Sequence, residues 1–270
     1  MERKPTAWIV IPARLNSTRL PGKMLLRETG QYLVVHTWEA ATKSRRAEKV
    51  LIATDSKEIQ LVAQEAGAEV VLTSTAPRCG TERVAEAVRL LTTGPDCIPP
   101  NVIINLQGDE PEINPQSLDD LIDTISANSD VGMATLATPI RDRSILFDPA
   151  CVKVLFDSHG RAVYFSRTPI PYPKNWDESL LWHEPPVYWQ HIGVYGFRRE
   201  VLERFVALPP ASWEEVESLE QLRAVWHGIS MAVVTVPQHV GGIDTPEDYA
   251  RFVARWRAKT GSLAEAHCWS

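Results

Sequence analysis

The chain has 270 residues, and its shares of hydrophobic (44%) and charged (23%) residues are ordinary for a globular protein. The formal net charge of −6 argues against a broad nucleic-acid-binding surface but leaves room for a local basic pocket. No stretch approaches the ~20 apolar residues of a membrane helix, and the four cysteines form no C-x-x-C pair. We therefore expect a soluble cytoplasmic protein with free thiols, without a nucleic-acid partner and without membrane insertion.

The first half of the chain alternates short apolar runs with amphipathic segments. The pattern predicts strands at 7–11, 49–55, 68–73 and 101–107, and helices at 31–44, 56–67 and 82–91. Such alternation joins parallel strands by right-handed crossovers and places helices on both faces of the sheet. The sequence therefore predicts a doubly wound α/β fold with a mostly parallel sheet.

The second half is less regular. Two β-rich runs around a turn predict a hairpin over 151–167, and five prolines predict a long loop over 168–186. The pattern then predicts a strand at 188–197, a helix at 218–228, a strand at 231–236, a helix at 245–258, and a frayed tail after residue 259.

The segment IPARLNSTRLPGK (11–23) follows the first predicted strand, at the sheet edge where open α/β folds bind ligands. It carries three cations and no acid: Arg14, Arg19 and Lys23. Ser17 and Met24 stand where a Walker A loop needs glycine and a hydroxyl residue, and no G-x-G-x-x-G follows any strand. The segment is thus either an anion-binding loop of another kind or a solvated basic loop.

Two aspartates lie at predicted element ends. Asp109 follows the strand at 101–107, and Asp244 precedes the helix at 245–258. If they meet at the same edge as the basic loop, they could hold Mg²⁺ against a triphosphate. The alternatives are a turn cap for Asp109 and a helix N-cap for Asp244. We expect the neighbouring acids to lie at helix starts or on the surface: Glu110, Glu112, Glu247 and Asp248.

Several blocks occur in one order between about residues 7 and 255: IPARLNSTRLPGK, ATDSKEI, GTERVAEA, NLQGDEP, VYFSRTPIPY, HIGVYGF, LEQLRAVWHG and GIDTPEDY. Together they closely resemble the 3-deoxy-manno-octulosonate cytidylyltransferases, or CMP-Kdo synthetases. The resemblance implies an enzyme that couples CTP to the sugar acid Kdo and releases pyrophosphate, for lipopolysaccharide biosynthesis. It also implies Mg²⁺, a homodimer and a nucleotide-diphospho-sugar transferase fold with a smaller lobe.

The resemblance also implies site residues. The triphosphate ligands are Arg14, Arg19 and Lys23; the segment against base and ribose contributes Gly80, Thr81 and Arg83, and Gln107 touches nucleotide or sugar. Asp109 and Asp244 are the metal ligands and, with Lys23, the catalytic residues. The sugar-acid contacts are Arg167, His191, Tyr195, Glu220 and Gln221. Three of these residues have a structural alternative: a helix cap for Thr81, an ion pair for Arg167 and the core for Tyr195.

The matched blocks also give a domain division. We expect a nucleotide-binding domain over 1–138 and 212–260, a smaller lobe with sugar-acid and dimer contacts over 139–211, and a tail over 261–270. Two features depart from the family pattern: Cys79 stands where a serine is usual, and the segment 172–190 resembles an insertion. Alternative functions are activation of a related sugar acid, such as 8-amino-Kdo or a sialic acid, and non-catalytic nucleotide binding.

Overall fold

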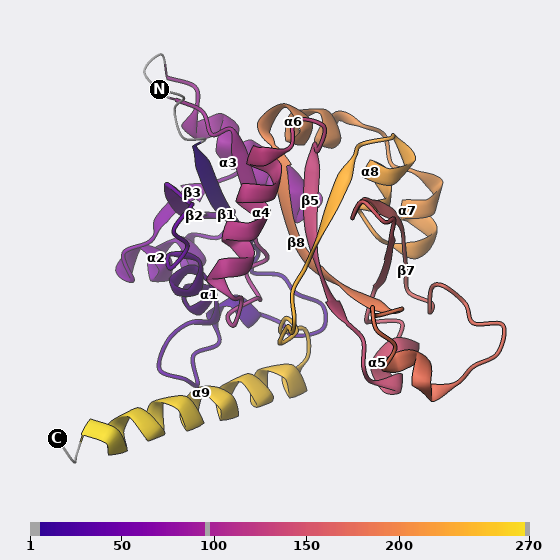
Figure 1. Cartoon of the computed structure of the whole chain (residues 1–270). Coiled ribbons are helices and arrows are strands. Elements are labelled where there is room, and N and C mark those ends of the chain that lie inside the picture. The colour runs from indigo at the N-terminus through magenta and orange to yellow at the C-terminus, as the bar shows by residue number, and fades with distance from the viewer. Residues whose placement is uncertain (1–5, 95–97, 268–270) are drawn as a thin grey trace.

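The computed structural model describes residues 6–94 and 98–267, with side chains described up to residue 260. A nine-stranded sheet runs through the molecule, and its main path has the order β3-β2-β1-β4-β8-β5-β9. Helices cover both sides of this sheet, and α9 extends below it as one long helix (Figure 1). The doubly wound, mostly parallel α/β fold predicted from the sequence is confirmed.

Four strands form the parallel half of the sheet: β1 (Ala7–Ala13), β2 (Lys49–Thr54), β3 (Glu69–Leu72) and β4 (Val102–Asn105). Each is a short run rich in β-branched residues, as expected of strands buried on both faces. Because these strands are parallel, the loops after β1 and β4 leave the sheet at the same edge. The basic loop and Asp109 are therefore neighbours.

The second half of the sheet is mixed. β8 (Trp189–Arg198) runs antiparallel between β4 and β5 (Met133–Pro139), and β9 (Met231–Thr235) pairs parallel to β5. The predicted hairpin is present as β6 (Lys153–Phe156) and β7 (Ala162–Ser166), attached to β8 through β6. The division at 139–211 stays a prediction, and within that segment β8 belongs to the main sheet.

The two faces of the sheet carry separate cores. In β1, Ala7, Ile9 and Ile11 pack on the side of α1 and α4, and Trp8 and Val10 pack on the side of α3 and α6. This alternation follows from the two-residue period of a strand.

The helices are α1 (Leu33–Ala41), α2 (Lys57–Glu65), α3 (Gly80–Leu91), α4 (Pro115–Ala127), α5 (Arg143–Phe147), α6 (Arg199–Ala207), α7 (Ser212–Glu217), α8 (Leu222–Trp226) and α9 (Pro246–His267), with 3-10 turns η1 (Lys23–Leu25) and η2 (Glu178–Leu181).

Two predictions of local structure were wrong. The helix expected from residue 218 begins only at Leu222, because Ser218 has a positive φ of 52° and ends α7. Glu220 and Gln221 therefore lie in the turn before α8. The tail expected to fray after residue 259 continues α9 to His267, and residues 268–270 lie outside the described residues. No helix in the described part of the chain is long and apolar enough to cross a membrane.

Candidate active site

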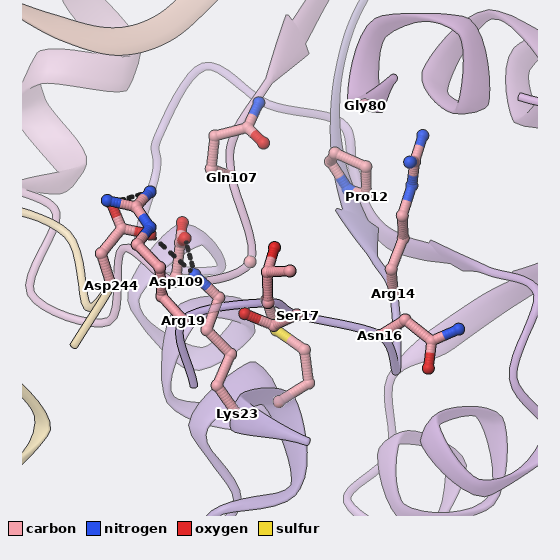
Figure 2. A pocket seen from close by; sticks show the side chains of 13 residues that line it. Pro12, Arg14, Asn16, Ser17, Arg19, Lys23, Gly80, Gln107, Asp109 and Asp244 are labelled. Carbon is pink, nitrogen blue, oxygen red and sulfur yellow. Dashed lines mark hydrogen bonds and ion pairs between the residues drawn. The ribbon is translucent and has the colours of Figure 1, made fainter. Parts of the chain in front are cut away.

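The basic loop after β1 forms one wall of a cavity of about 260 Å³, which we call the loop cavity. Figure 2 shows side chains from the β1 loop, from the end of β4 and from the segment before α9 converging on it. Its lining is Pro12, Arg14, Asn16, Ser17, Thr18, Arg19, Lys23, Met24, Gly80, Gln107, Gly108, Asp109 and Asp244. It therefore contains all three predicted triphosphate ligands and both predicted metal ligands.

Lys23 is the centre of this cavity. Its Nζ donates hydrogen bonds to Asp109 Oδ2 (2.5 Å), Asp244 Oδ1 (3.1 Å) and the carbonyl oxygen of Ile243 (2.9 Å). Arg19 adds an ion pair to the second oxygen of Asp244 at 3.0 Å. Burial alone would lower the pKa of Lys23, but the two carboxylates raise it above its ordinary value. The ammonium is therefore charged and bridges both aspartates (Figure 2).

The two aspartates are free to face this cation. The cap of α9 is made by Thr245, whose Oγ1 accepts from the backbone N–H of Asp248 at 3.2 Å, so Asp244 is not needed as a cap. The N–H of Ile243 donates to the carbonyl oxygen of Asp109 at 2.9 Å and ties the two loops together. The structure thus brings the two carboxylates to one positive charge.

These residues fit a divalent cation that arrives with phosphate. Mg²⁺ is usually held by one or two carboxylates, with substrate phosphates and water completing the shell. Asp109 and Asp244 already share one cation, the Lys23 ammonium. Within the described residues there is no group of three or more His, Cys, Asp and Glu side chains that could hold a metal ion. The donor set therefore suits a metal whose remaining ligands come from a substrate.

The segment before α3 forms the opposite wall. Arg14 donates to the carbonyl oxygens of Pro77 (3.1 Å) and Arg78 (2.9 Å), so the basic loop is tied to this segment. A Cβ at Gly80 would lie 3.2 Å from the side chain of Pro12 and 3.3 Å from Gln107 Oε1, closer than ordinary contacts. A glycine at position 80 thus lets α3 approach the end of β1.

Arg83, predicted to lie against base or ribose, does not line the loop cavity. Its side chain is 1% exposed and pairs with Asp55 at 2.7 Å, and it also donates to Thr73 Oγ1. The structure therefore gives Arg83 a buried ion pair that joins the ends of β2 and β3 to α3.

Thr81 and Glu220 contact each other, although they were assigned to the nucleotide and to the sugar respectively. Thr81 Oγ1 donates to Glu220 Oε2 at 2.9 Å, and Cys79 Sγ donates to Glu220 Oε1 at 2.8 Å. Burial raises the pKa of Glu220, and these two hydrogen bonds oppose that effect. Thr81 does not cap α3, whose N-cap residue is Cys79 without a side-chain cap bond. Glu220 therefore braces the segment before α3.

A second cavity of about 300 Å³, the β8 cavity, shares Gln107, Asp109 and Asp244 with the loop cavity. Three of the predicted sugar contacts line it: His191, Tyr195 and Gln221. His191 Nε2 lies 2.9 Å from Thr135 Oγ1, and burial lowers the pKa of this histidine to about 3. His191 is therefore neutral at pH 7. The β8 cavity offers uncharged hydrogen-bonding groups, as a polyhydroxylated ligand requires.

Arg167, the predicted partner of the sugar carboxylate, does not line the β8 cavity. Its guanidinium donates to the backbone carbonyl oxygens of Glu217 (2.7 Å), Pro149 (2.9 Å) and Ser218 (3.4 Å). These bonds join the end of β7 to the end of α7. In this structure the Arg167 guanidinium thus holds backbone segments together. The structural alternative was an ion pair with an acid, whereas the observed partners are carbonyl oxygens.

Among the β8 cavity residues that were not identified from the sequence are an acid and a histidine that contact each other, Glu110 and His239. Glu110 was expected at a helix start or on the surface, and this was wrong: it is 8% exposed and lines the cavity. His239 Nε2 lies 3.3 Å from Glu110 Oε2, and a Cβ at Gly242 would come within 2.9 Å of Glu110 Oε1. Glu110 directly follows Asp109 at the sheet edge, which could have indicated its place. No local pattern marks His239.

Comparison with known proteins agrees with this geometry. A family model described as "Cytidylyltransferase" matches residues 8–231. The 3-deoxy-manno-octulosonate cytidylyltransferases of Rhodopirellula baltica and Chlorobaculum tepidum are 42% and 44% identical, with 92% and 95% of this chain and 97% and 99% of theirs covered. A solved CMP:2-keto-3-deoxy-manno-octonic acid synthetase complexed with CTP superposes with a TM-score of 0.85 at 34% identity, covering 94% of this chain and 99% of that chain. The chain belongs to the family of 3-deoxy-manno-octulosonate cytidylyltransferases.

Proposed function

We propose that this enzyme transfers the cytidylyl group of CTP to Kdo, giving CMP-Kdo and pyrophosphate for lipopolysaccharide biosynthesis. One observation carries the proposal: the loop cavity with its three cations and the β8 cavity, which combines neutral polar groups with the acid Glu110, meet at Gln107, Asp109 and Asp244. A triphosphate suits the first cavity and a sugar acid the second. Their reacting atoms would then meet beside the two carboxylates.

In this proposal the anomeric hydroxyl oxygen of Kdo attacks the α-phosphorus of CTP. A new O–P bond forms, the bond to the β-phosphate oxygen breaks, the hydroxyl loses its proton, and pyrophosphate leaves. Arg14, Arg19 and Lys23 neutralise charge on the triphosphate and on the leaving pyrophosphate. Each of these side chains has a protein partner in the structure and would exchange it for phosphate oxygen.

Asp109 and Asp244 are the residues that would hold Mg²⁺. When bound, the ion stabilises charge on the phosphate oxygens and lowers the pKa of a coordinated hydroxyl. His191 and Tyr195 orient sugar hydroxyls as neutral donors or acceptors, because burial lowers the pKa of the histidine and raises that of the tyrosine. No dedicated general base or covalent enzyme intermediate is part of this mechanism.

The direct test is an assay of the purified protein with CTP, Mg²⁺ and Kdo, following pyrophosphate release and the mass of the nucleotide sugar. We expect stoichiometric pyrophosphate and CMP-Kdo. Parallel reactions with 8-amino-Kdo and with a sialic acid identify the preferred sugar acid. CTP binding without pyrophosphate release for any sugar acid would refute the proposal and favour the non-catalytic alternative.

The same proposal includes a homodimer and a cytoplasmic location. Within the predicted lobe at 139–211 three large aromatic side chains are exposed, as a dimer contact would require: Phe147, Tyr172 and Trp182. Light scattering on the purified chain tests the dimer.

The proposed cytoplasmic location agrees with the free thiols of Cys79 and Cys151, because a reducing compartment keeps cysteines unpaired.

A further inference from the structure

Asn105 is a fully buried polar side chain at the end of β4, two residues before Gln107 and four before Asp109. It lines neither the loop cavity nor the β8 cavity. A buried amide is costly unless its donor and its acceptor are both used. Asn105 uses both: its Nδ2 donates to Thr81 Oγ1 at 3.1 Å, and its Oδ1 accepts from Gln107 Nε2 at 3.0 Å.

The contact between Thr81 and Glu220 determines which atom donates in each of these hydrogen bonds. The hydrogen of the Thr81 hydroxyl is donated to Glu220 Oε2, so its oxygen can only accept from the Asn105 amide. The Nδ2 of Asn105 must then face Thr81, which leaves Oδ1 facing Gln107. Because Asn105 Oδ1 is an acceptor, Gln107 must turn its donor, Nε2, toward it. Rotating either amide by half a turn would place two acceptors against each other.

Gln107 is consequently held with its amide against Gly80, where a Cβ would lie 3.3 Å from Oε1 and 3.5 Å from Nε2. Gly80 and Pro12 line the loop cavity and do not line the β8 cavity. Among the described residues none donates a hydrogen bond to this oxygen, so it is an acceptor open to a ligand (Figure 2). The Oε1 of Gln107 would accept from an N–H or O–H group of the nucleotide.

We infer that Asn105 is a positioning residue, which acts through Gln107 and fixes its amide as a hydrogen-bond acceptor for the nucleotide. The inference deepens the proposed function, because it takes CTP as that nucleotide. The donor on CTP is either the exocyclic amine of cytosine or a ribose hydroxyl. UTP lacks the amine, and 2′-deoxy-CTP and 3′-deoxy-CTP each lack one hydroxyl, so these analogues separate the two sources.

The test is a double-mutant cycle on CTP affinity, measured by calorimetry with Mg²⁺ and without a sugar acid. Asn105→Leu removes both hydrogen bonds and keeps the number and branching of the side-chain heavy atoms, and Gln107→Ala removes the acceptor. We expect each to weaken CTP binding about tenfold, and the double variant to bind like Gln107→Ala alone. Effects that multiply to about a hundredfold in the double variant, or normal CTP affinity in Asn105→Leu, would overturn the inference. Asn105→Ser, whose hydroxyl is too short to reach Gln107, serves if Asn105→Leu does not fold.

Two further comparisons separate positioning from loss of stability. Asn105→Asp keeps an oxygen for Gln107 Nε2 but places an acceptor against Thr81 Oγ1, so its Tm should fall. Its CTP affinity should still stay within about twofold of wild type, and binding as weak as that of Asn105→Leu would contradict the inference. The matched control is Asp119→Asn at the opposite edge of the sheet, where Asp119 accepts from Ser44 Oγ at 2.5 Å and from Arg46 N–H at 3.1 Å. This control should lower Tm and leave CTP affinity unchanged.

The analogues give the last readout. Wild type should bind CTP more tightly than the analogue that lacks the donor, and Asn105→Leu should lose this preference. Full retention of the preference in Asn105→Leu would refute the role of Asn105. Because binding is measured without a sugar acid, a protein that binds CTP but releases no pyrophosphate refutes the proposed function and leaves this test valid.

Discussion

Replacing Lys23 by methionine should create a metal site in the ligand-free protein. The Lys23 side chain is 9% exposed and holds two carboxylates, of which Asp109 is 20% and Asp244 44% exposed. Removing one partner of a buried ion pair costs about 3–5 kcal/mol, and an exposed pair contributes at most about 1 kcal/mol. Since Asp244 is partly exposed, we take about 2–3 kcal/mol as the stabilisation that Lys23 gains from both carboxylates together.

A metal ion that binds both carboxylates must displace this ammonium, so the same energy opposes metal binding in the wild type. At about 1.4 kcal/mol for each factor of ten, Lys23→Met should bind Mn²⁺ about 30- to 140-fold more tightly in the absence of CTP. Electron paramagnetic resonance of free Mn²⁺ measures this directly. Lys49→Met is the matched control, because Lys49 pairs with Glu69 at 2.9 Å, away from both cavities. Equal Mn²⁺ affinity in wild type and Lys23→Met would refute the reasoning.

Three other predictions follow from single groups. Asp109→Asn should reduce pyrophosphate release by about 10²–10³-fold while CTP still binds; full activity with Mg²⁺ would contradict the metal role. Burial raises the pKa of Cys79 to about 12, so iodoacetamide at pH 8 should spare this thiol in the native protein and modify it in urea, as peptide mass spectrometry can show. Burial lowers the pKa of His36 to about 4 and of His191 to about 3, below the ordinary 6.5. As the pH falls, the unfolded chain therefore binds more protons than the folded protein does. The free energy of unfolding should drop by about 2 kcal/mol per histidine between pH 7.5 and 5. In urea titrations His36→Gln should remove about half of the combined drop of the two histidines.

The parallel half of the sheet could be predicted because its signals are local. Short apolar runs ended by Pro12, Asp55 and Gly108 mark strands whose burial on both faces needs no knowledge of their partners. The place of β8 could not be predicted. Its insertion between β4 and β5 depends on pairing with residues far away in the chain, and nothing within 189–198 specifies these partners.

The predicted start of the helix at 218–228 was wrong for a related reason, although α8 (Leu222–Trp226) lies within that range. The segment has helical composition, but Ser218 takes a left-handed conformation, and the Glu220 side chain accepts hydrogen bonds from Cys79 and Thr81. A tertiary contact thus prevails over local propensity. Glu110 shows the same limit: in sequence it is one of several acids, and only the fold buries it beside His239.

The basic loop explains how three cations can lie close together without an acid among them. The acids come from elsewhere in the fold, since Asp109 is 86 residues and Asp244 is 221 residues from Lys23 in the chain. Arg14 is satisfied by backbone carbonyl oxygens, which carry no net charge. Lys23 and Arg19 are therefore paired with protein carboxylates while Arg14 keeps a charge that no carboxylate of the described residues compensates, and a triphosphate must exchange with partners that already exist. Such an exchange favours a nucleotide that brings its own divalent cation, because the carboxylates released by Lys23 and Arg19 then gain a cation of higher charge.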